Sequence, residues 1–143
     1  LLASRAQIVE KVTGIAVGRT AQTIHFLHGA AYSDQLAYGT VVGRYRVHYA
    51  DGSEQVVKIR YGEHLLNWFL PQNRRVSEAR LAFSITSQRD ADRELGCYLM
   101  SWKNPKRDVK VTHIDFETSG SDAAPFLLGV TLGTAETSKV SSQ

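Results

Sequence analysis

The stretch "GRYRVHYADGSEQVVKIRY", residues 43–61, decides the fold class. Aromatic and aliphatic side chains occupy every second position on both sides of a central Asp-Gly pair: Tyr45, Val47, Tyr49, Val57, Ile59 and Tyr61. A period of two residues is typical of a strand with one buried face, and Asp-Gly is typical of a tight turn. The stretch therefore predicts an antiparallel β-hairpin.

The length of the hairpin loop follows from which side chains must share a face. A two-residue loop would pair Tyr49 with Glu54 and would put buried and solvated side chains on the same face. A three-residue loop, 50–52, pairs Tyr49 with Ser53 and keeps the two faces separate. It also places Gly52 where such a loop requires a left-handed backbone conformation. We predict the three-residue loop.

Other segments rich in apolar residues predict further strands at 23–28, 79–86, 96–102, 109–118 and 125–132. Segment 96–102 is apolar on both faces, which indicates a central strand. In three of the other segments, alternation predicts one apolar face each: Leu81, Phe83 and Ile85; Thr112, Ile114 and Phe116; Phe126, Leu128, Val130 and Leu132. Residues 7–17 fit either a further strand or an irregular lead-in.

Seven to eight short strands with almost no helical periodicity predict an all-β fold, an antiparallel β-sandwich. The chain has 143 residues, of which 43% are hydrophobic, and this is enough for one hydrophobic core. We expect a single domain over residues 1–132 and a polar C-terminal tail or linker over 133–143.

The charge, the cysteine content and the length of the apolar runs exclude several kinds of partner and structural feature. The net charge is only +3, and lysines and arginines are spread along the chain, so we expect no nucleic-acid partner. The single cysteine, Cys97, excludes an internal disulfide framework and a cysteine-based zinc site. No run of eighteen apolar residues occurs, so we expect no membrane insertion.

Catalytic motifs are missing as well. The sequence holds no nucleophile elbow, no phosphate-binding glycine loop and no H-E-x-x-H motif, and its five histidines are scattered. Asp115 and Glu117 share one strand face at a spacing that glycoside hydrolysis permits, yet paired acids on an outer strand face are usually solvated. We therefore predict that the protein is not an enzyme and that it has neither a metal site nor a cofactor.

The candidate binding residues come from an assumption about strand direction. If successive strands alternate in direction, the loops after 23–28, 53–61 and 96–102 lie at the same end of the sandwich. These loops carry both tryptophans together with polar side chains: His28, Tyr32, Arg60, Asn67, Trp68, Trp102 and Asn104. Indole faces stack on sugar rings while Arg and Asn side chains bond hydroxyl groups, so this rim predicts a glycan site. The alternative is that both tryptophans plug the end of the core and that Arg60 pairs with Glu63.

Four segments carry a resemblance to a known family: "VGRTAQTIHFLHGAAY", "VGRYRVHYADGSEQVVKIRYGEHLLNWF", "SWKNPKRDVKVTHIDF" and "SDAAPFLLGVTL". In the order of these patterns, residues 14–132 resemble the galactose-binding-like, jelly-roll accessory modules of bacterial surface and carbohydrate-active proteins. The resemblance implies a non-catalytic module that binds a glycan or polysaccharide and is covalently linked to other domains. It also implies a location outside the cell or in the cell envelope of a bacterium. Members often carry a structural calcium, but the segment 33–40 has a single carboxylate, Asp34, and matches such a loop poorly.

The sequence thus predicts a carbohydrate-binding module with Trp68 and Trp102 as stacking platforms and Arg60, Asn67, Asn104 and His28 as hydroxyl partners. The rival hypothesis is a structural or protein-interaction β-sandwich domain of a multidomain envelope protein. The two differ in what they expose, since a glycan site needs an open indole face. An interaction module instead needs an apolar patch with a polar rim.

Overall fold

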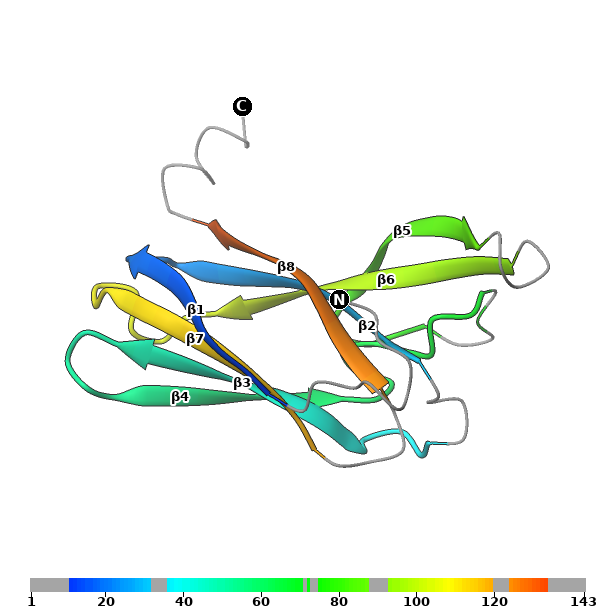
Figure 1. The fold of residues 1–143 in the computed structure, drawn as a ribbon, viewed down its shortest axis with the longest axis horizontal. Coiled ribbons are helices and arrows are strands. Elements are labelled where there is room, and N and C mark those ends of the chain that lie inside the picture. Colours follow the sequence, from blue (N-terminus) through cyan, green and yellow to red (C-terminus); the bar gives the residue numbers. More distant parts are fainter. Residues whose placement is uncertain are drawn as a thin grey trace.

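The computed structural model describes residues 11–31, 36–70, 72, 75–87, 93–119 and 124–133. Within these ranges the chain is all-β, with eight strands and no helix (Figure 1). The strands are β1 (Lys11–Arg19), β2 (Thr23–Ala31), β3 (Val41–Tyr49), β4 (Glu54–Arg60), β5 (Arg80–Ser87), β6 (Arg93–Lys103), β7 (Val111–Thr118) and β8 (Ala124–Gly133). The described part of the chain holds no helix long and apolar enough to cross a membrane.

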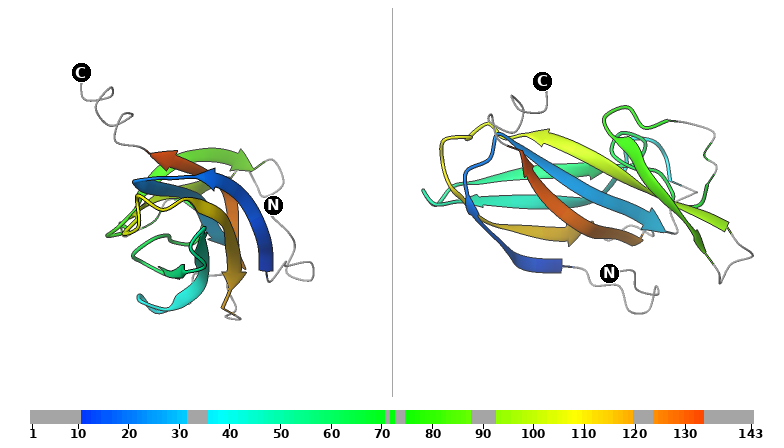
Figure 2. Two further views of the ribbon diagram at one scale, coloured as in Figure 1. Left: turned by 90° about the vertical axis from the view of Figure 1, so that its left-hand side faces the viewer. Right: turned by 90° about the horizontal axis from the view of Figure 1, so that it is seen from above.

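The strands form two four-stranded sheets that make a β-sandwich (Figures 1 and 2). Sheet A has the order β1-β7-β3-β4, and sheet B has the order β5-β6-β2-β8. Every strand pair within the two sheets is antiparallel. The fold class expected from the sequence, an antiparallel sandwich, is therefore confirmed.

The core lies between the sheets and is built around stacked aromatic rings. The Phe26 ring of β2 stacks on the Tyr45 ring of β3, with 3.8 Å between the ring centroids and 11° between the planes. Phe116 of β7 lies against the same tyrosine at 5.5 Å. Ring contacts of this kind add to the free energy gained by removing apolar surface from water. The rings therefore tie the two sheets together across the sandwich.

The predicted hairpin is confirmed in every detail. Tyr45 pairs with Val57, and the Tyr49 N–H donates to the Ser53 carbonyl at 2.9 Å, which leaves the three-residue loop 50–52. Gly52 has a φ of 89°, the left-handed conformation that the loop requires. The alternating apolar side chains of both strands lie in the core.

The predicted core face of segment 79–86 is wrong. Leu81, Phe83 and Ile85 are 47%, 40% and 54% exposed. The physical reason is the position of β5 at the edge of sheet B, where only β6 pairs with it in the described chain. A register shift between Leu81 and Phe83 also places these two side chains opposite Tyr98 and Cys97, on different faces of β6.

The predicted face of segment 125–132 is wrong in its first half. The register against β2 shifts between Leu27 and His28, which inserts Leu128 as an extra residue in β8. Leu127, Val130 and Leu132 contact the core, whereas Leu128 is exposed. Phe126 is buried on the other face of β8, opposite Gly29.

The remaining strand predictions agree with the structure. Segment 96–102 lies within β6, which has β5 on one side and β2 on the other, as expected for a strand apolar on both faces. Ile114 and Phe116 of β7 are buried, while Thr112 is half-buried. Of the two options for the N-terminal segment, the strand is correct over Lys11–Arg19, with two register shifts against β7.

Candidate functional site

The segment that follows the hairpin, residues 67–70, fills a gap inside sheet B. β2 and β6 pair directly only as far as His28 and Tyr98. Beyond that point the Trp68 N–H donates to the Ala30 carbonyl at 2.9 Å, and the Gly96 N–H donates to the Trp68 carbonyl at 2.7 Å. The aromatic end of the run after β4, residues 67–70, is therefore a short wedge between two strands that have separated.

Trp68 covers a buried phenylalanine on the outer side of sheet B. Its ring lies edge-on to Phe126, with 5.7 Å between the ring centroids. The Phe126 ring lies directly over Gly29, where an added Cβ would meet the ring at 2.7 Å. Gly29 thus provides the space for Phe126, and the half-buried Trp68 closes that space from the side.

Arg60 and Asn67 have structural contacts beside this wedge. The Arg60 guanidinium donates to the Gly39 carbonyl at 3.1 Å, and its backbone N–H donates to Nδ1 of His64 at 2.9 Å. Asn67 is buried and forms a bridge with Ala30 of β2. Both residues stabilise the path of the chain from β4 into sheet B.

His28, predicted as a hydroxyl partner, lies in the core with 1% exposure. Its Nε2–H donates to the His64 carbonyl at 2.9 Å, since a carbonyl can only accept. Nδ1 then accepts from the Tyr45 hydroxyl at 2.7 Å. Desolvation by burial lowers the pKa of His28 to about 4, so the ring is neutral at pH 7 and both of its nitrogens are used internally.

Trp102 and Asn104 lie at the opposite end of the sandwich. β2 and β6 are antiparallel, with Thr23 paired to Lys103, so the loop after β6 lies beside the start of β2 rather than its end. The expectation of a single rim is therefore wrong, because it assumed that these strands run in the same direction. Tyr32 of the predicted rim, and Asp34 of the candidate calcium loop, are outside the described residues.

Asn104 connects the loops at its end of the sandwich through hydrogen bonds. Its Oδ1 accepts from the Tyr49 hydroxyl at 2.6 Å and from the Lys106 N–H at 3.0 Å. Its Nδ2 donates to the Ala21 carbonyl at 2.7 Å. Trp102 packs against the core nearby and is half-buried. The amide of Asn104 therefore joins three loops that meet at this end.

The structure exposes apolar side chains at another place, the edge strand β5. Phe83 and Ile85 lie opposite Cys97 and Leu95 of β6 on one face, and Leu81 lies opposite Tyr98 on the other face. All three side chains are at least 40% exposed. The sequence suggested burial here, and only the order of strands in the sheet reveals the exposure.

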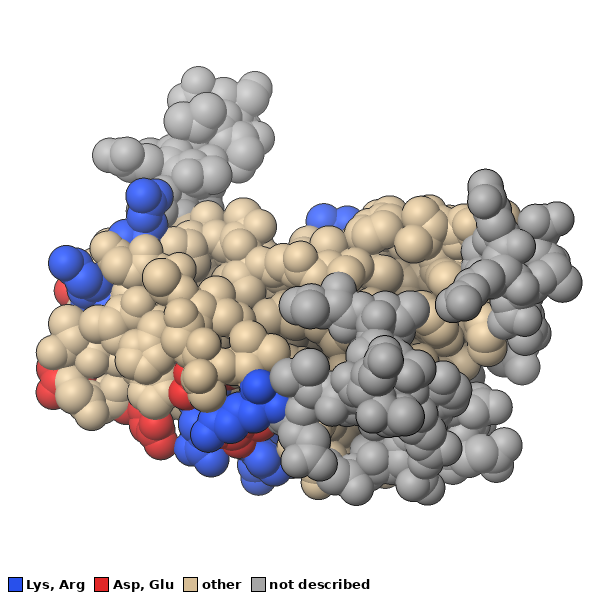
Figure 3. All heavy atoms as spheres, viewed as in Figure 1, with Lys and Arg blue, Asp and Glu red and all other residues tan. Residues whose placement is uncertain are grey.

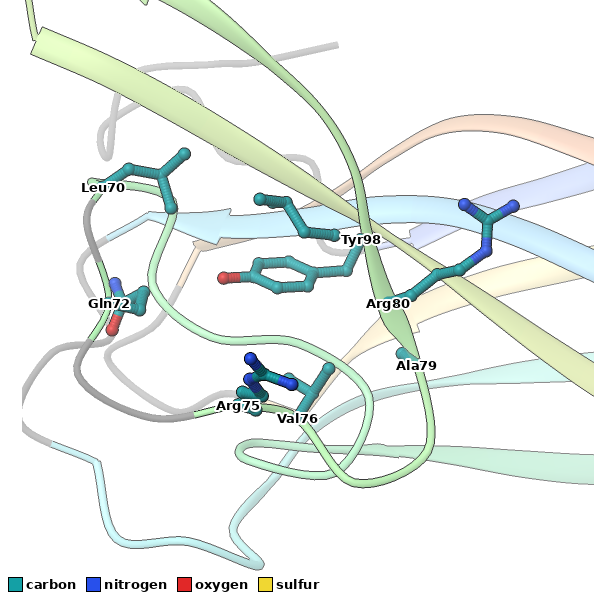
Figure 4. A pocket seen from close by; sticks show the side chains of 8 residues that line it. Leu70, Gln72, Arg75, Val76, Ala79, Arg80 and Tyr98 are labelled. Atoms are coloured by element: carbon teal, nitrogen blue, oxygen red, sulfur yellow. The ribbon is translucent and has the colours of Figure 1, made fainter.

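A cavity of about 600 Å³ adjoins this edge. It is lined by Leu70, Gln72, Arg75, Val76, Ala79, Arg80, Leu81 and Tyr98. Figure 4 shows the Tyr98 ring between Leu70 on one side and Arg75 and Val76 on the other. Burial raises the pKa of the Tyr98 hydroxyl to about 12, so this group is a neutral hydrogen-bonding group. The lining is mainly apolar and includes two cationic residues, Arg75 and Arg80.

The two sheets differ in the charge of their surfaces. Charged side chains gather around sheet A, at the left and lower left of Figure 3, whereas the visible surface of sheet B is largely uncharged. On sheet A, Glu117 lies within 3.4 Å of Lys11 and Arg44 and within 2.9 Å of Arg46. Desolvation opposes ionisation of Glu117, yet hydrogen bonds from Arg46 and Arg44 outweigh it and lower the pKa of Glu117. This acid is therefore ionised and paired, which does not suit a general acid.

Two groups of side chains have the composition of a metal site. His48, His113 and Asp115 lie on the outer face of sheet A, and Glu63, His64 and Glu78 lie near the end of β4. In each group the ligand atoms are within 4.8 Å of one another. The sequence did not suggest either group, because His48 and His113 meet only through the pairing of β3 with β7.

The candidate site lies along the edge strand β5. Its main features are the exposed apolar side chains on both faces of this strand and the cavity beside it. Comparison with protein families, with curated proteins and with solved structures gives no significant match to this chain.

Proposed function

We propose that this chain is a non-catalytic interaction module whose strand β5 binds an extended, apolar segment of a partner protein. The observation that carries the proposal is the exposure of Leu81, Phe83 and Ile85 on an edge strand. An edge strand presents unpaired backbone N–H and C=O groups, and a partner strand can pair with them. The exposed apolar side chains add the hydrophobic contact that such pairing needs.

The β5 edge differs from the other three edges in the features that normally prevent strand addition. Apart from Arg80 at its start, β5 carries no charge up to Thr86, and after the shift between Leu81 and Phe83 its register against β6 is regular. β4 carries Glu54 and Lys58 on its outer face. β1 has two register shifts, and β8 has Pro125 as its second residue and contains the shift at Leu128. Charges, proline and bulges all weaken edge pairing, so β5 is the edge best suited to a partner.

An added strand would place its side chains alternately on the two faces of sheet B. On one face they would pack on Phe83 and Ile85, and on the other they would meet Leu81 at the cavity. Backbone pairing supplies affinity in such complexes, while pockets for alternate side chains supply specificity. Arg75 in the lining favours a partner segment with an acidic residue among its apolar ones.

The proposal also covers the topology of the module and the kind of protein that contains it. Seven connections join the eight described strands, and five of them cross from one sheet to the other. This crossing supports a jelly-roll, galactose-binding-like topology. The resemblance of residues 14–132 suggests an accessory module joined to other domains of a bacterial envelope or extracellular protein. In that setting the partner segment would belong to a neighbouring domain or to another surface protein.

The test uses synthetic ten-residue peptides with alternating apolar residues and one acidic residue, followed by NMR of the backbone amides. We expect saturable shifts at β5, which Phe83→Lys and Ile85→Lys each reduce at least tenfold in affinity. Val56→Lys is the matched control, because Val56 is 44% exposed on β4, one of the two edge strands of sheet A. Equal binding by all three variants would overturn the proposal. Sedimentation would instead identify a second copy of this chain as the partner of the β5 edge if the protein self-associates through β5 and binds no peptide.

Glycan binding is the second candidate, and the partial exposure of both tryptophans is the observation that favours it. Because Trp68 and Trp102 lie at opposite ends, each would form its own small subsite rather than one rim. Titration of tryptophan fluorescence with soluble oligosaccharides tests this candidate directly.

A further inference from the structure

We propose that His48, His113 and Asp115 form a zinc-binding site on the outer face of sheet A. β3 and β7 are neighbours in this sheet, and His48 lies directly opposite His113. Asp115 is two residues further along β7, so it projects from the same face as His113. One ligand atom from each side chain lies within 4.8 Å of the other two. Small movements of these side chains would bring all three atoms into the coordination distance of one ion.

Each of the three side chains is held by a second partner at the atom that would not bind the metal. Nδ1 of His48 is 3.5 Å from a carboxylate oxygen of Glu54. Nδ1 of His113 is 2.9 Å from the Thr112 hydroxyl, and Oδ1 of Asp115 accepts from the Gly14 N–H at 2.8 Å. Metal-binding histidines and carboxylates in proteins are usually oriented by such outer contacts. The cluster is therefore more than three polar side chains that happen to be close.

The hydrogen bonds also fix which nitrogen of His113 is available. The Thr112 hydroxyl donates to the His48 carbonyl at 3.2 Å, so its oxygen is free to accept. Nδ1–H of His113 then donates to this oxygen, and Nε2 carries the lone pair. Neutral imidazole with a free Nε2 is the form that binds zinc.

His48 and Asp115 already contact each other where the ion would lie. Nε2 of His48 is 2.8 Å from Oδ2 of Asp115, so in the absence of metal a proton lies between them. Zinc would displace this proton and bind both atoms, and the neutral His48 ring would then carry its one proton on Nδ1, which faces Glu54. The rings of His48 and His113 are stacked at 4.1 Å with 12° between their planes, so they must tilt apart to point both lone pairs at one ion.

Of the two acids on this face of β7, Glu117 and Asp115, Asp115 is the one available to bind a metal ion. Glu117 is paired with Lys11, Arg44 and Arg46, so its charge is already compensated. Asp115 is within hydrogen-bond distance of His48 and a backbone N–H, and neither carries a permanent positive charge. Two imidazole nitrogens and one carboxylate oxygen suit Zn²⁺ and leave one tetrahedral position for water or an outside ligand.

Zinc bound here would link three strands of sheet A. The ligands come from β3 and β7, and the Gly14 N–H from β1 holds the carboxylate. Gly14 has a φ of 73° at a register shift in β1, and this conformation directs its N–H toward Asp115. The metal would therefore stabilise the irregular edge strand β1 against β7.

Isothermal titration of the chelator-treated chain with ZnCl₂ tests the proposal. We expect one zinc ion per chain, with binding lost in His48→Gln, His113→Gln and Asp115→Asn. His25→Gln is the control variant, because this histidine lies on β2 of the other sheet and hydrogen-bonds Ser101. Thr112→Val removes only the support of His113 and should weaken zinc binding on the order of tenfold. Circular dichroism of each metal-free variant shows whether it has kept its fold.

Spectroscopy of the wild-type protein distinguishes a specific metal site from adventitious metal binding. Co²⁺ should give the intense visible bands of a four-coordinate ion, and Zn²⁺ should shift the imidazole NMR signals of His48 and His113 together. No zinc binding by the folded wild-type chain would overturn the proposal. Equal zinc affinity in the wild type and in folded His48→Gln or His113→Gln, or equal loss in His25→Gln, would overturn it as well.

Discussion

Nδ1 of His28 lies 2.7 Å from the Tyr45 hydroxyl, between the two sheets and away from water. The Tyr45 ring in turn stacks on Phe26, and the second nitrogen of His28 donates to the His64 carbonyl. One imidazole therefore links β2, β3 and the turn after β4 through hydrogen bonds. Since burial also lowers the pKa of His28 to about 4, this linkage makes stability depend on pH.

The first prediction concerns that dependence. The unfolded chain binds a proton at His28 with a pKa of about 6.5, whereas the folded chain does so only at about 4. Between these values the unfolded state holds more protons, so the free energy of unfolding falls as the pH is lowered from 7 to 4. The expected loss from His28 is about 3 kcal/mol, measured by urea unfolding across this range.

The His28→Gln variant serves as the comparison, because its side chain can donate to the His64 carbonyl but does not titrate. Other titrating groups remain in both proteins, so the difference between the two pH curves isolates His28. Parallel curves for wild type and variant would show that the histidine is not buried in its neutral form.

The second prediction concerns the space above Gly29. A Gly29→Ala substitution puts a Cβ 2.7 Å from the Phe126 ring, and the ring is held by Trp68. We expect the free energy of unfolding to fall by about 1–3 kcal/mol, as in other overpacked sites. Trp68 fluorescence should also shift, because its neighbour must move. Gly129→Ala in β8 is the matched control, since an added Cβ there has no atom within 4 Å. Equal stability of the two variants would contradict the packing described here.

The third prediction separates the roles of the two tryptophans. Trp68→Ala uncovers Phe126 and should lower the free energy of unfolding by about 2–3 kcal/mol, as should Trp102→Ala, which removes a contact with the core. We expect no saturable fluorescence change with oligosaccharides in the wild-type chain if the interaction proposal is correct. A saturable change that one variant loses without a change in its thermal midpoint would favour the glycan candidate.

Local pattern was sufficient for the hairpin because its register depends on residues close together in sequence. Side-chain parity alone distinguished the loop 50–52 from a two-residue loop. The faces of β5 and β8 were not predictable in the same way, since one extra residue at a bulge moves the following side chains to the other face. Nothing in the spacing of Leu81 and Phe83, or of Phe126 and Leu128, marks such an insertion.

The candidate sites depend on pairings between distant residues. His48 and His113 are 65 positions apart in sequence and become neighbours only because β7 lies beside β3. The predicted rim failed for a related reason, because the assumed alternation gave β2 and β6 the same direction, whereas they pair as antiparallel neighbours. A usable signal was present in His113 and Asp115, which lie on the same face of one strand, but their partner strand was unknown.

The fourth prediction concerns Asn104, which is 5% exposed and which the sequence placed among the glycan contacts. Asn104→Ala leaves the Tyr49 hydroxyl, the Lys106 N–H and the Ala21 carbonyl without their amide partner. Unsatisfied buried groups each cost about 1–3 kcal/mol, so we expect a loss of at least about 2 kcal/mol in urea unfolding.

Tyr49→Phe gives the control for that loss, because it removes one hydrogen bond and leaves the other two intact. It should cost about 1 kcal/mol, and the double variant should be less destabilised than the sum of the single ones, since both changes remove the same bond. Additive losses would mean that the tyrosine and the asparagine do not share this bond in solution. A coupled loss would establish that Asn104 connects the hairpin end of sheet A to the start of β2, a structural role that leaves its amide no group for a sugar.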